Sequence, residues 1–364
     1  MKTLRVAIAC GGTGGHLFPG IAIAQTLHQR GHEVMLLVSA KQIDAVALKD
    51  YPEFRAEVIP GMGWSGINPQ AIRFLFKIFQ ARSVCRGLFK TFKPDAVLGM
   101  GGFTSAVPLL VGRRMKKATY LHESNAIPGR VTKLLAKQVS RVFLGFDACD
   151  SYLETGNTVV TGTPLRKDLI KIPRDEALAQ LGLNPHLKTI LVMGGSQGAR
   201  GVNEMVLKSI PLWEREKDQW QFIHLTGEMD ATIVDINYRR CRLNAYVRAF
   251  SMNMGLLLSA SDLVISRSGA SSLTEISAFG LPSILVPFPA AIDDHQTLNA
   301  RVFSMVGAAY LEPQSKLTPQ GLDQKVSEIL HQSDRLESMK IASCSLFTPD
   351  AAERIVVEIE RGTA

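Results

Sequence analysis

The sequence has 364 residues, of which 46% are apolar and 20% are charged, and its formal net charge is +8. This composition is that of a packed globular protein with room for two domains, and it excludes a disordered chain. The five cysteines form no C-x-x-C pair, so we expect a reducing compartment, without a disulfide framework or a thiolate metal site.

The positive charge is concentrated in the first half of the chain. Residues 1–164 hold 20 lysines and arginines against 10 acidic residues, whereas the remainder holds 21 against 23. Between Arg73 and Arg141 there are 14 basic residues and two acidic ones. A solvated basic surface is the ordinary explanation, but so sharp an asymmetry favours an anionic partner, either nucleic acid or an anionic membrane.

Taken in chain order, the first half alternates short β-rich runs with longer helical patterns. The first apolar run ends at Cys10 and meets glycines, so we interpret it as a β-strand rather than a signal peptide. The strands expected here are Val6–Cys10, Glu33–Val38, Ala56–Ile59, Ala96–Gly99, Thr119–Leu121 and Arg141–Leu144. The helices expected between them include Ile21–Arg30, Gln70–Phe92 and Val131–Val139.

The second half repeats this alternation, which is typical of parallel sheets covered on both faces. Its expected strands are Thr189–Met193, Gln221–Leu225, Leu263–Ser266 and Ser283–Val286, and its expected helices include Val202–Trp213, Ser271–Phe279 and Asp350–Arg361. The longest uncharged apolar stretch, Ile276–Ile292, is interrupted by one glycine and three prolines, so we expect no transmembrane helix.

Each half opens with a strand, a glycine-rich turn and a helix. The first turn, Gly11–His16, fails the dinucleotide-binding pattern, because Leu17 stands where a third glycine is required and no acid ends the second strand. No P-loop motif is present. Glycine turns before helices still suit an anionic ligand, since backbone amides and the helix N-terminus face it. A purely structural tight turn is the alternative.

Six segments, in the right order along the chain, resemble the MurG family of N-acetylglucosaminyltransferases (glycosyltransferase family 28). They are Gly11-Gly12-Thr13-Gly14-Gly15-His16-x-x-Pro19-Gly20, His122-Glu123-x-Asn125-x-x-Pro128-Gly129, Thr161-Gly162-x-Pro164-x-Arg166, Gly194-Gly195-Ser196-Gln197-Gly198-Ala199, Arg267-Ser268-Gly269-Ala270 followed by Glu275, and Asp294-x-Gln296-x-x-Asn299-Ala300. The similarity covers essentially the whole chain.

The resemblance implies the α/β GT-B fold, in which two Rossmann-like doubly wound domains face each other across a cleft. The expected N-terminal domain, residues 1–163, binds the acceptor and the membrane, and a C-terminal helix, 348–364, packs back on it. Residues 164–347 are expected to form the domain that binds the UDP-sugar donor.

The implied activity is an inverting transfer of N-acetylglucosamine from UDP-N-acetylglucosamine to the 4-hydroxyl of the muramyl residue of lipid I, the undecaprenyl-diphosphate-linked muramyl pentapeptide. The product is lipid II, used in peptidoglycan synthesis and so in cell shape and division. No cofactor and no metal are expected, since the sequence contains no D-x-D motif. Another GT-B glycolipid transferase, a UDP-sugar epimerase and a non-catalytic nucleotide-sugar binding protein remain alternatives.

The family's functional residues carry over onto matching positions. Thr13, Gly14 and Gly15 would form part of the diphosphate and sugar pocket, and Asn125 would contact the transferred sugar or the acceptor. Arg166 and Ser196 would bind donor phosphate, Glu275 the ribose hydroxyls and Gln296 the sugar hydroxyls. The remaining expected donor-site residues are Ser251, Ala270, Ser271, Ser272, Leu273 and Thr274. A surface acid at Glu275, a surface cation at Arg166, an ordinary ion pair at Arg267 and a helix cap at Ser196 are the simpler alternatives.

His16 is the predicted general base, with Glu275 as the second catalytic candidate. A sugar hydroxyl that attacks an anomeric carbon must lose its proton, and an imidazole with an ordinary pKa of about 6.5 can accept it. A histidine that only packs or caps at a helix start is the alternative. Some positions depart from the family pattern, with Ser251 for an apolar residue, Asn253 for an acid, Ser272 for threonine and His295 for glutamine.

A basic and apolar segment predicts attachment to an anionic membrane surface. Its residues are Ile72, Phe74, Leu75, Phe76, Lys77, Phe79 and Arg82. The apolar set is larger than one buried helix face needs, and apolar residues ringed by cations suit a monotopic membrane protein. We therefore expect a peripheral enzyme on the cytoplasmic face of the inner membrane. No nucleic-acid-binding motif is found, so nucleic acid is not the expected partner.

Overall fold

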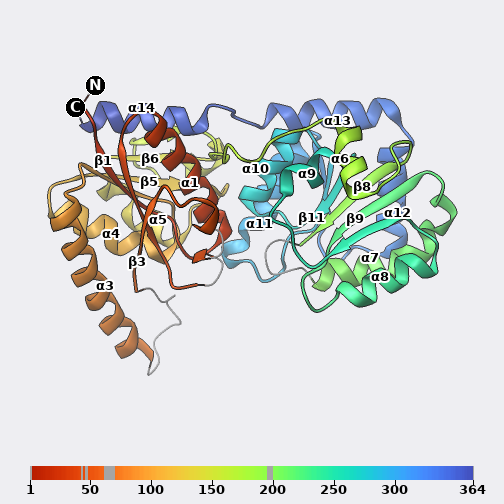
Figure 1. The fold of residues 1–364 in the computed structure, drawn as a ribbon, viewed down its shortest axis with the longest axis horizontal. Coiled ribbons are helices and arrows are strands. Elements are labelled where there is room, and N and C mark those ends of the chain that lie inside the picture. The colour runs from red at the N-terminus through yellow and green to blue at the C-terminus, as the bar shows by residue number, and fades with distance from the viewer. Residues whose placement is uncertain (1, 42–43, 46–47, 61–69, 195–199, 364) are drawn as a thin grey trace. The chain divides into compact units, whose positions relative to one another are not determined.

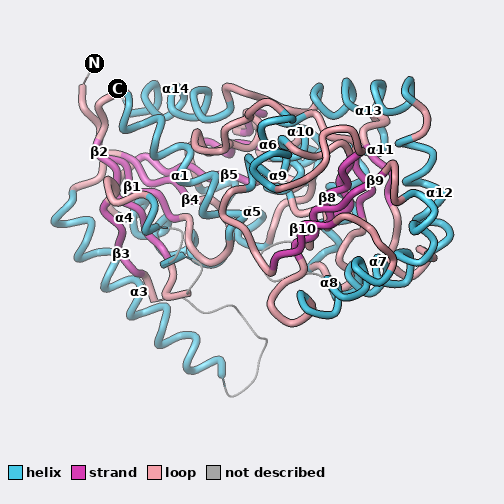
Figure 2. The backbone as a smooth tube through the Cα atoms, turned by 45° about the vertical axis from the view of Figure 1, so that its right-hand side comes forward, coloured by secondary structure: helices cyan, strands magenta, loops and turns pink. Residues whose placement is uncertain are grey.

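The computed structural model describes residues 2–41, 44–45, 48–60, 70–194 and 200–363, and of 70–75 it describes only the backbone. The chain divides into two compact units. One comprises Met1–Lys167 and Thr348–Ala364, and the other comprises Asp168–Phe347. Each unit contains a parallel β-sheet covered by helices, as Figures 1 and 2 show. The predicted α/β architecture of two doubly wound domains is thus confirmed.

The first sheet has the strand order β3-β2-β1-β4-β5-β6-β7, and its neighbouring strands are parallel. The strands are β1 (Arg5–Ala9), β2 (Glu33–Val38), β3 (Arg55–Val58), β4 (Ala96–Gly99), β5 (Ala118–Glu123), β6 (Arg141–Leu144) and β7 (Thr158–Val160). The order reverses between β1 and β4. The carboxyl ends of these two strands therefore form the switch point at which doubly wound sheets bind their ligands.

Two layers of helices cover this sheet. They are α1 (Gly14–Gln29), α3 (Gln70–Phe92), α4 (Gly102–Arg114), α5 (Arg130–Leu135) and α14 (Ala351–Thr363). Along β1, Val6 and Ile8 pack with α1 and α14, whereas Ala7 and Ala9 pack with α3, α4 and α5. Both faces of β1 are therefore buried, which explains why the strand is an unbroken apolar run.

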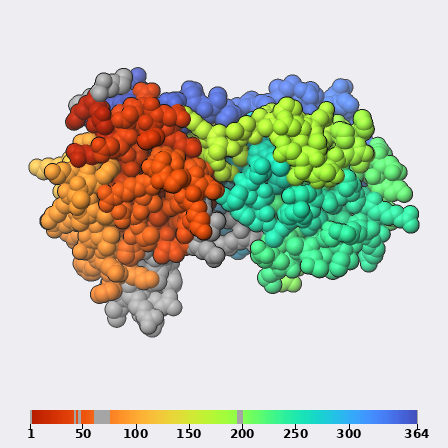
Figure 3. Space-filling view, viewed as in Figure 1, coloured from red at the N-terminus to blue at the C-terminus, as the bar shows by residue number. Residues whose placement is uncertain are grey.

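The last helix returns to the first unit. Ile355 and Ile359 of α14 are buried against α1, and the Glu360 carboxylate binds the Arg30 guanidinium at 2.7 Å and the His32 Nε2 atom at 2.9 Å. Figure 3 shows α14, in blue, at the surface beside the red N-terminal segments. Chain segments more than 300 residues apart thus share one core.

The second sheet has the strand order β10-β9-β8-β11-β12-β13, also parallel throughout. Its strands are β8 (Lys188–Met193), β9 (Trp220–Leu225), β10 (Ala245–Arg248), β11 (Leu263–Ser266), β12 (Ser283–Leu285) and β13 (Ala309–Leu311). Its helices are α6 (Arg174–Leu181), α7 (Arg200–Trp213), α8 (Ala231–Arg240), α9 (Met254–Ser259), α10 (Ala270–Phe279), α11 (His295–Met305), α12 (Pro319–Leu330) and α13 (Ser333–Ser345). The switch point lies between β8 and β11.

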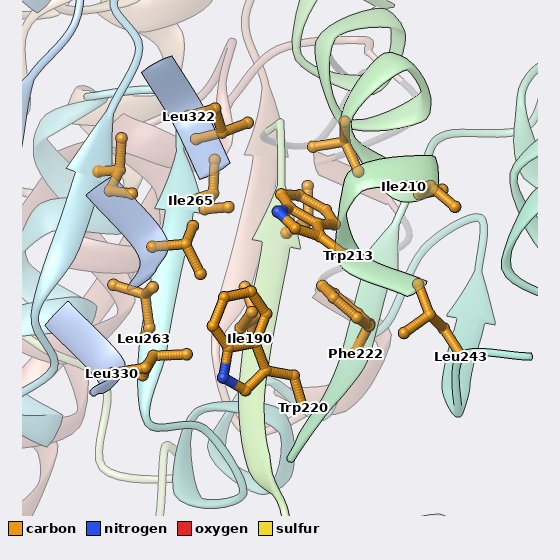
Figure 4. Packing of buried hydrophobic residues seen from close by; sticks show 14 of the residues in the cluster. Ile190, Ile210, Trp213, Trp220, Phe222, Leu243, Leu263, Ile265, Leu322 and Leu330 are labelled. Atoms are coloured by element: carbon orange, nitrogen blue, oxygen red, sulfur yellow. The ribbon is translucent and has the colours of Figure 1, made fainter. Parts of the chain in front are cut away.

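The core of the second unit is rich in aromatic side chains. Trp213 of α7 stacks on Phe222 of β9 with ring centroids 5.1 Å apart, and Trp220 is buried nearby (Figure 4). Leu263 and Ile265 of β11 complete this face of the sheet with Leu322 of α12. Strands β8 and β11 are the buried central strands of this sheet, and the second glycine-rich turn and α10 follow them in the sequence.

The structure differs from the sequence-based expectation at several elements. The first helix begins at Gly14 and not at Ile21, because the glycines and Pro19 form its first turns rather than precede it. The predicted helix Val131–Val139 is α5 followed by a short 3₁₀ turn, Ala136–Gln138. Strands β7, β10 and β13 were not expected. Among the described residues, no helix has both the length and the apolar character needed to cross a membrane.

Candidate active site

The first glycine-rich turn joins β1 to α1 at the switch point of the first sheet. Gly12 adopts a left-handed conformation with φ of +110°, and a Cβ atom at Gly11 would lie 2.2 Å from the backbone nitrogen of Ser39. Thr13, in extended conformation, is the N-cap residue of α1, and its side chain makes no capping hydrogen bond. A ligand at this edge of the sheet therefore meets backbone amides at a helix N-terminus, which favours an anion.

The imidazole of His16 lies against the beginning of α4. Its Nε2 atom is 3.2 Å from the position of a Cβ atom built on Gly101, and its Cε1 atom is 2.9 Å from the equivalent position on Gly102. Both glycines are left-handed, with φ of +92° and +66°. The Nδ1 atom of His16 is 3.2 Å from the Thr13 hydroxyl. His16 thus connects the turns that follow β1 and β4, the two strands of the switch point.

The N-terminus of α4 also lacks a side-chain cap, because its N-cap residue is Gly101. Helices α1 and α4 therefore both begin at the switch point, and His16 contacts both beginnings. Two helix N-termini concentrate partial positive charge there. The arrangement can therefore hold a negatively charged group next to an imidazole.

A second histidine, His122, is fully buried at the end of β5. Its Nε2 atom is 3.2 Å from the Gly162 carbonyl oxygen, and its Nδ1 atom is 3.3 Å from the Ser124 hydroxyl. Because a carbonyl only accepts, Nε2 carries the proton and Nδ1 accepts from Ser124. Burial lowers the pKa of His122 to about 4, and the nearby His16 acts in the same direction. His122 is therefore neutral at neutral pH.

The buried carboxylate of Glu123 shapes the turn between β5 and α5. One oxygen accepts hydrogen bonds from the Asn125 backbone amide at 3.1 Å and from the Asn125 side-chain amide at 2.9 Å. The other accepts from the Gly129 amide at 2.9 Å and from the Thr132 hydroxyl at 2.6 Å. Glu123 thus fixes the orientation of Asn125. No role was predicted for His122 or Glu123, although a histidine and an acid stand together at the end of a buried strand.

Arg166 belongs to the first unit. Its guanidinium lies over the ring of Phe18 in α1, 4.4 Å from the ring centroid, and the residue is buried. The division between the units falls after Lys167, whereas the sequence-based boundary fell after residue 163. The structure thus groups Arg166 with the first glycine-rich turn rather than with the other expected donor-site residues.

In the second unit, α10 begins directly after β11 with Gly269 as its N-cap residue and no side-chain cap. Ala270, Ser271 and Ser272 form the first turn of the helix. The Leu273 amide donates to the Gly269 carbonyl at 3.0 Å, and the Leu273 side chain is buried in the core. The Thr274 hydroxyl donates to the Ala270 carbonyl at 3.0 Å. A ligand at this terminus would meet the amides of the first turn, while Leu273 and Thr274 support the helix.

The remaining expected donor-site side chains lie around α10. Glu275 is half-buried and follows Ser271 by four residues, so both are on one face of the helix. The Gln296 side-chain oxygen accepts a hydrogen bond from the Phe288 amide at 2.9 Å. The Ser268 hydroxyl donates to the Gln296 backbone carbonyl at 2.8 Å. Ser196 lies outside the described residues.

Arg267 is held by backbone groups and an amide. Its guanidinium donates to the carbonyls of Val286 at 3.0 Å and Pro287 at 2.9 Å, and to the Gln314 side chain at 2.7 Å. Burial lowers its pKa. The ordinary ion pair considered from the sequence is not among these contacts. Arg267 instead ties the end of β11 to the segment that follows β12, which carries Phe288.

The residues that depart from the family pattern lie at helix beginnings or in the segments just before them. Asn253 caps α9, since its side-chain oxygen accepts the Leu256 amide at 3.2 Å, and asparagine caps a helix as well as aspartate does. The Ser251 hydroxyl accepts the Asn253 amide at 3.1 Å. His295 bonds the Ile292 carbonyl at 2.7 Å through Nδ1 at the start of α11. Ser272 is half-buried in the first turn of α10.

The segment expected at the membrane lies on α3. Residues Phe76 and Phe79 are 70% and 65% exposed, and Lys77 and Arg82 are exposed. The C-terminal half of the helix is different, because Ala81, Cys85, Phe89 and Phe92 are buried. Figure 1 shows the N-terminal half of α3 extending beyond the sheet. The side chains of Ile72, Phe74 and Leu75 lie outside the described part of the chain.

Comparison with known proteins identifies the family. Residues 6–144 match the glycosyltransferase family 28 N-terminal domain, and residues 189–355 match the glycosyltransferase family 28 C-terminal domain. A relative from Geotalea uraniireducens is 34% identical over 99% of both chains. It is named UDP-N-acetylglucosamine--N-acetylmuramyl-(pentapeptide) pyrophosphoryl-undecaprenol N-acetylglucosamine transferase.

Solved structures agree with this match. The crystal structure of Acinetobacter baumannii MurG has a TM-score of 0.78 and 27% identity, and it covers 98% of this chain and 99% of that one. A putative UDP-N-acetylglucosamine 2-epimerase from Listeria monocytogenes has a TM-score of 0.72 over 100% of this chain and 97% of its own, but only 14% identity, so it shares the fold alone. The chain belongs to glycosyltransferase family 28, and within it to the MurG family of N-acetylglucosamine transferases.

Proposed function

We propose that this chain transfers N-acetylglucosamine from UDP-N-acetylglucosamine to the 4-hydroxyl of the muramyl residue of lipid I, with lipid II and UDP as products. The family match extends over nearly the whole chain, and one structural observation supports the proposal further. His16 lies where two uncapped helix N-termini, those of α1 and α4, begin at the switch point of the first sheet. An acceptor that carries a diphosphate needs such a combination of anion-binding amides and a base.

We assign the acceptor to the first unit. The lipid-linked diphosphate would lie against the amides that follow Thr13, including those of Gly14 and Gly15. His16 would act as the base through its Nε2 atom. In the tautomer that this requires, Nδ1 carries the proton and donates a hydrogen bond to the Thr13 hydroxyl. The muramyl hydroxyl would give its proton to Nε2 while its oxygen attacks the anomeric carbon. The bond from that carbon to the UDP phosphate oxygen breaks, and the configuration inverts.

We assign the donor mainly to the second unit. Ser196 and the first-turn amides of α10 would bind the diphosphate of UDP, and Glu275 would accept hydrogen bonds from both ribose hydroxyls. Gln296 would donate to the sugar hydroxyls, since the Phe288 amide already occupies its side-chain oxygen. Arg166 would contribute a positive charge to the donor phosphates. Amides and cations would then stabilise the leaving UDP without a bridging metal.

We assign membrane attachment to α3. Two phenylalanines that are mostly exposed beside two exposed cations match the way in which monotopic proteins bind anionic lipid. The lipid acceptor resides in the membrane, so attachment near the acceptor-binding unit would bring enzyme and substrate together. We place the protein at the cytoplasmic face of the membrane, where a UDP-sugar donor is available.

Incubation with labelled UDP-N-acetylglucosamine and a lipid I analogue tests the proposed function. Labelled lipid product supports the transferase. Appearance of a free epimerised sugar or its UDP derivative without the lipid would favour an epimerase, which shares this fold. Tight binding of the nucleotide sugar without any turnover, also in the presence of the lipid, would favour a binding protein.

A further inference from the structure

A buried acid outside the residues discussed above holds the first glycine-rich turn. Asp44 is fully buried, and its Oδ2 atom accepts hydrogen bonds from the Gly12 amide at 2.9 Å, the Ser39 amide at 2.9 Å and the Ser39 hydroxyl at 2.6 Å. Ser39 directly follows β2, which pairs with β1. One carboxylate oxygen therefore ties the glycine turn to the end of the neighbouring strand.

Two further side chains hold the same turn. The Lys41 ammonium donates to the Gly12 carbonyl at 2.7 Å, so the amide and the carbonyl of Gly12 are both bound by side chains. The Thr104 hydroxyl, from α4, donates to the Gly11 carbonyl at 2.7 Å. The turn is thus held from the β2 side and from the α4 side, immediately before Thr13.

The two carboxylate oxygens of Asp44 differ in their hydrogen bonds, which argues against a purely structural role for this residue. Its Oδ1 atom is buried without a hydrogen-bond partner among the described residues. A buried acceptor without a partner destabilises the fold. The carboxylate also binds the Gly12 amide, so this backbone group of the turn is engaged within the protein. A hydrogen bond to a charged acceptor is roughly twice as strong as one between neutral groups, so the carboxylate gives a stiffer turn than a neutral side chain would.

We propose that Asp44 is a positioning residue for the transfer reaction, acting through Gly12. It fixes the turn so that Thr13, His16 and the first amides of α1 meet the acceptor in the reactive geometry. This inference rests on the proposed function. It assigns Asp44 no contact with either substrate.

Three variants test the inference in the full-length protein. Asp44→Ala removes the acceptor, Asp44→Asn keeps a neutral acceptor, and Asp50→Asn changes an exposed acid in the following segment as the control. Hydrogen exchange of the backbone amides between residues 10 and 17, measured without substrates, reports the turn directly. Steady-state kinetics report kcat and the KM of each substrate, and thermal unfolding reports the folded fraction.

We expect faster exchange of this segment in Asp44→Ala and a loss of about 10²-fold in kcat/KM for the lipid acceptor, the usual effect of a displaced catalytic group. The KM for the donor should stay within about threefold, because the donor contacts we assign lie mainly in the other unit. Asp44→Asn should fall between Asp44→Ala and the control. If Asp44→Ala does not fold, Lys41→Met, which releases the Gly12 carbonyl, replaces it. This variant should also show faster exchange and a lower kcat/KM for the acceptor, with smaller changes in both.

Unchanged exchange between residues 10 and 17 would overturn the inference, and so would a lowered melting temperature with normal kinetic constants for each folded molecule. A donor KM raised as much as the acceptor KM would also overturn it. If the unmodified enzyme transfers no label to lipid, the proposed function fails and takes the catalytic part of the inference with it. In that case the exchange result still decides whether Asp44 holds the turn.

Discussion

Replacement of Gly102 by alanine displaces His16 without removing it. The new Cβ atom would lie 2.9 Å from Cε1 and 3.2 Å from Nδ1 of the imidazole, closer than carbon and nitrogen atoms pack, so the ring must move. Because Gly102 has a φ of +66°, alanine also adds about 1–2 kcal/mol of backbone strain. We expect kcat for transfer to fall by about 10²-fold, while the KM for UDP-N-acetylglucosamine changes little.

Gly31→Ala is the matched control, since Gly31 has a φ of +80° and no atom within 4 Å of its added Cβ position. Both variants should lose similar thermal stability, a few degrees in melting temperature for units of this size. In a His16→Ala background, Gly102→Ala should have little further effect on kcat, because both changes act on one group. A kcat for Gly102→Ala within a few-fold of that for Gly31→Ala would refute the placement of His16 in the reaction.

Three more predictions concern other parts of the chain. Glu275→Ala should raise the KM for the donor by about 10–100-fold, because it removes a charge-assisted hydrogen bond of about 1.5–3 kcal/mol. Glu214→Ala, which removes an exposed acid, is the control. An equal rise in KM in this control would contradict the ribose assignment. Phe76→Ser with Phe79→Ser, and Lys77→Glu with Arg82→Glu, should each weaken binding to anionic liposomes, and the charge pair should do so more at low salt. Met305→Ser, which changes an exposed apolar residue of α11, is the control. If the α3 variants bind liposomes as strongly as this control does, the membrane surface lies elsewhere. Burial lowers the pKa of His224 to about 3, so below its ordinary 6.5 the unfolded chain binds a proton that the folded chain excludes. As the pH is lowered from 6.5 to 3, this histidine should therefore reduce the free energy of unfolding of the second unit by up to about 1.4 kcal/mol per pH unit. Unfolding can be followed by the fluorescence of Trp213 and Trp220. If His224→Gln shows the same dependence of stability on pH, the prediction is contradicted.

The central strands of both sheets were predictable from the sequence and three edge strands were not. Strands β1, β4, β8 and β11 are buried on both faces, so each is an unbroken apolar run that periodicity detects. Strands β7, β10 and β13 lie at sheet edges, have three or four residues and are partly exposed, so their local sequence resembles a loop. These strands are defined by their hydrogen bonds to a neighbouring strand, and the local sequence does not contain that neighbour.

In the candidate site, too, only contacts between residues close in the sequence were predictable. The contact between Thr13 and His16 spans three residues and follows from a turn entering a helix, so a local pattern could indicate it. The contact of His16 with Gly101 and Gly102 spans more than 80 residues, and it exists only because β4 lies beside β1. Asp44 was not singled out, because nothing in the sequence around it shows that its carboxylate reaches back to Gly12.

The pH dependence of label transfer to the lipid I analogue, compared between the unmodified enzyme and His16→Ala, tests the account most directly. The unmodified enzyme should form labelled lipid, with a rate that falls on the acidic side as the imidazole becomes protonated. The His16→Ala variant should be about 10²–10⁴-fold slower in kcat, with a similar donor KM and no acidic limb. A stable His16→Ala variant with kcat within a few-fold of the unmodified enzyme and the same acidic limb would contradict the account.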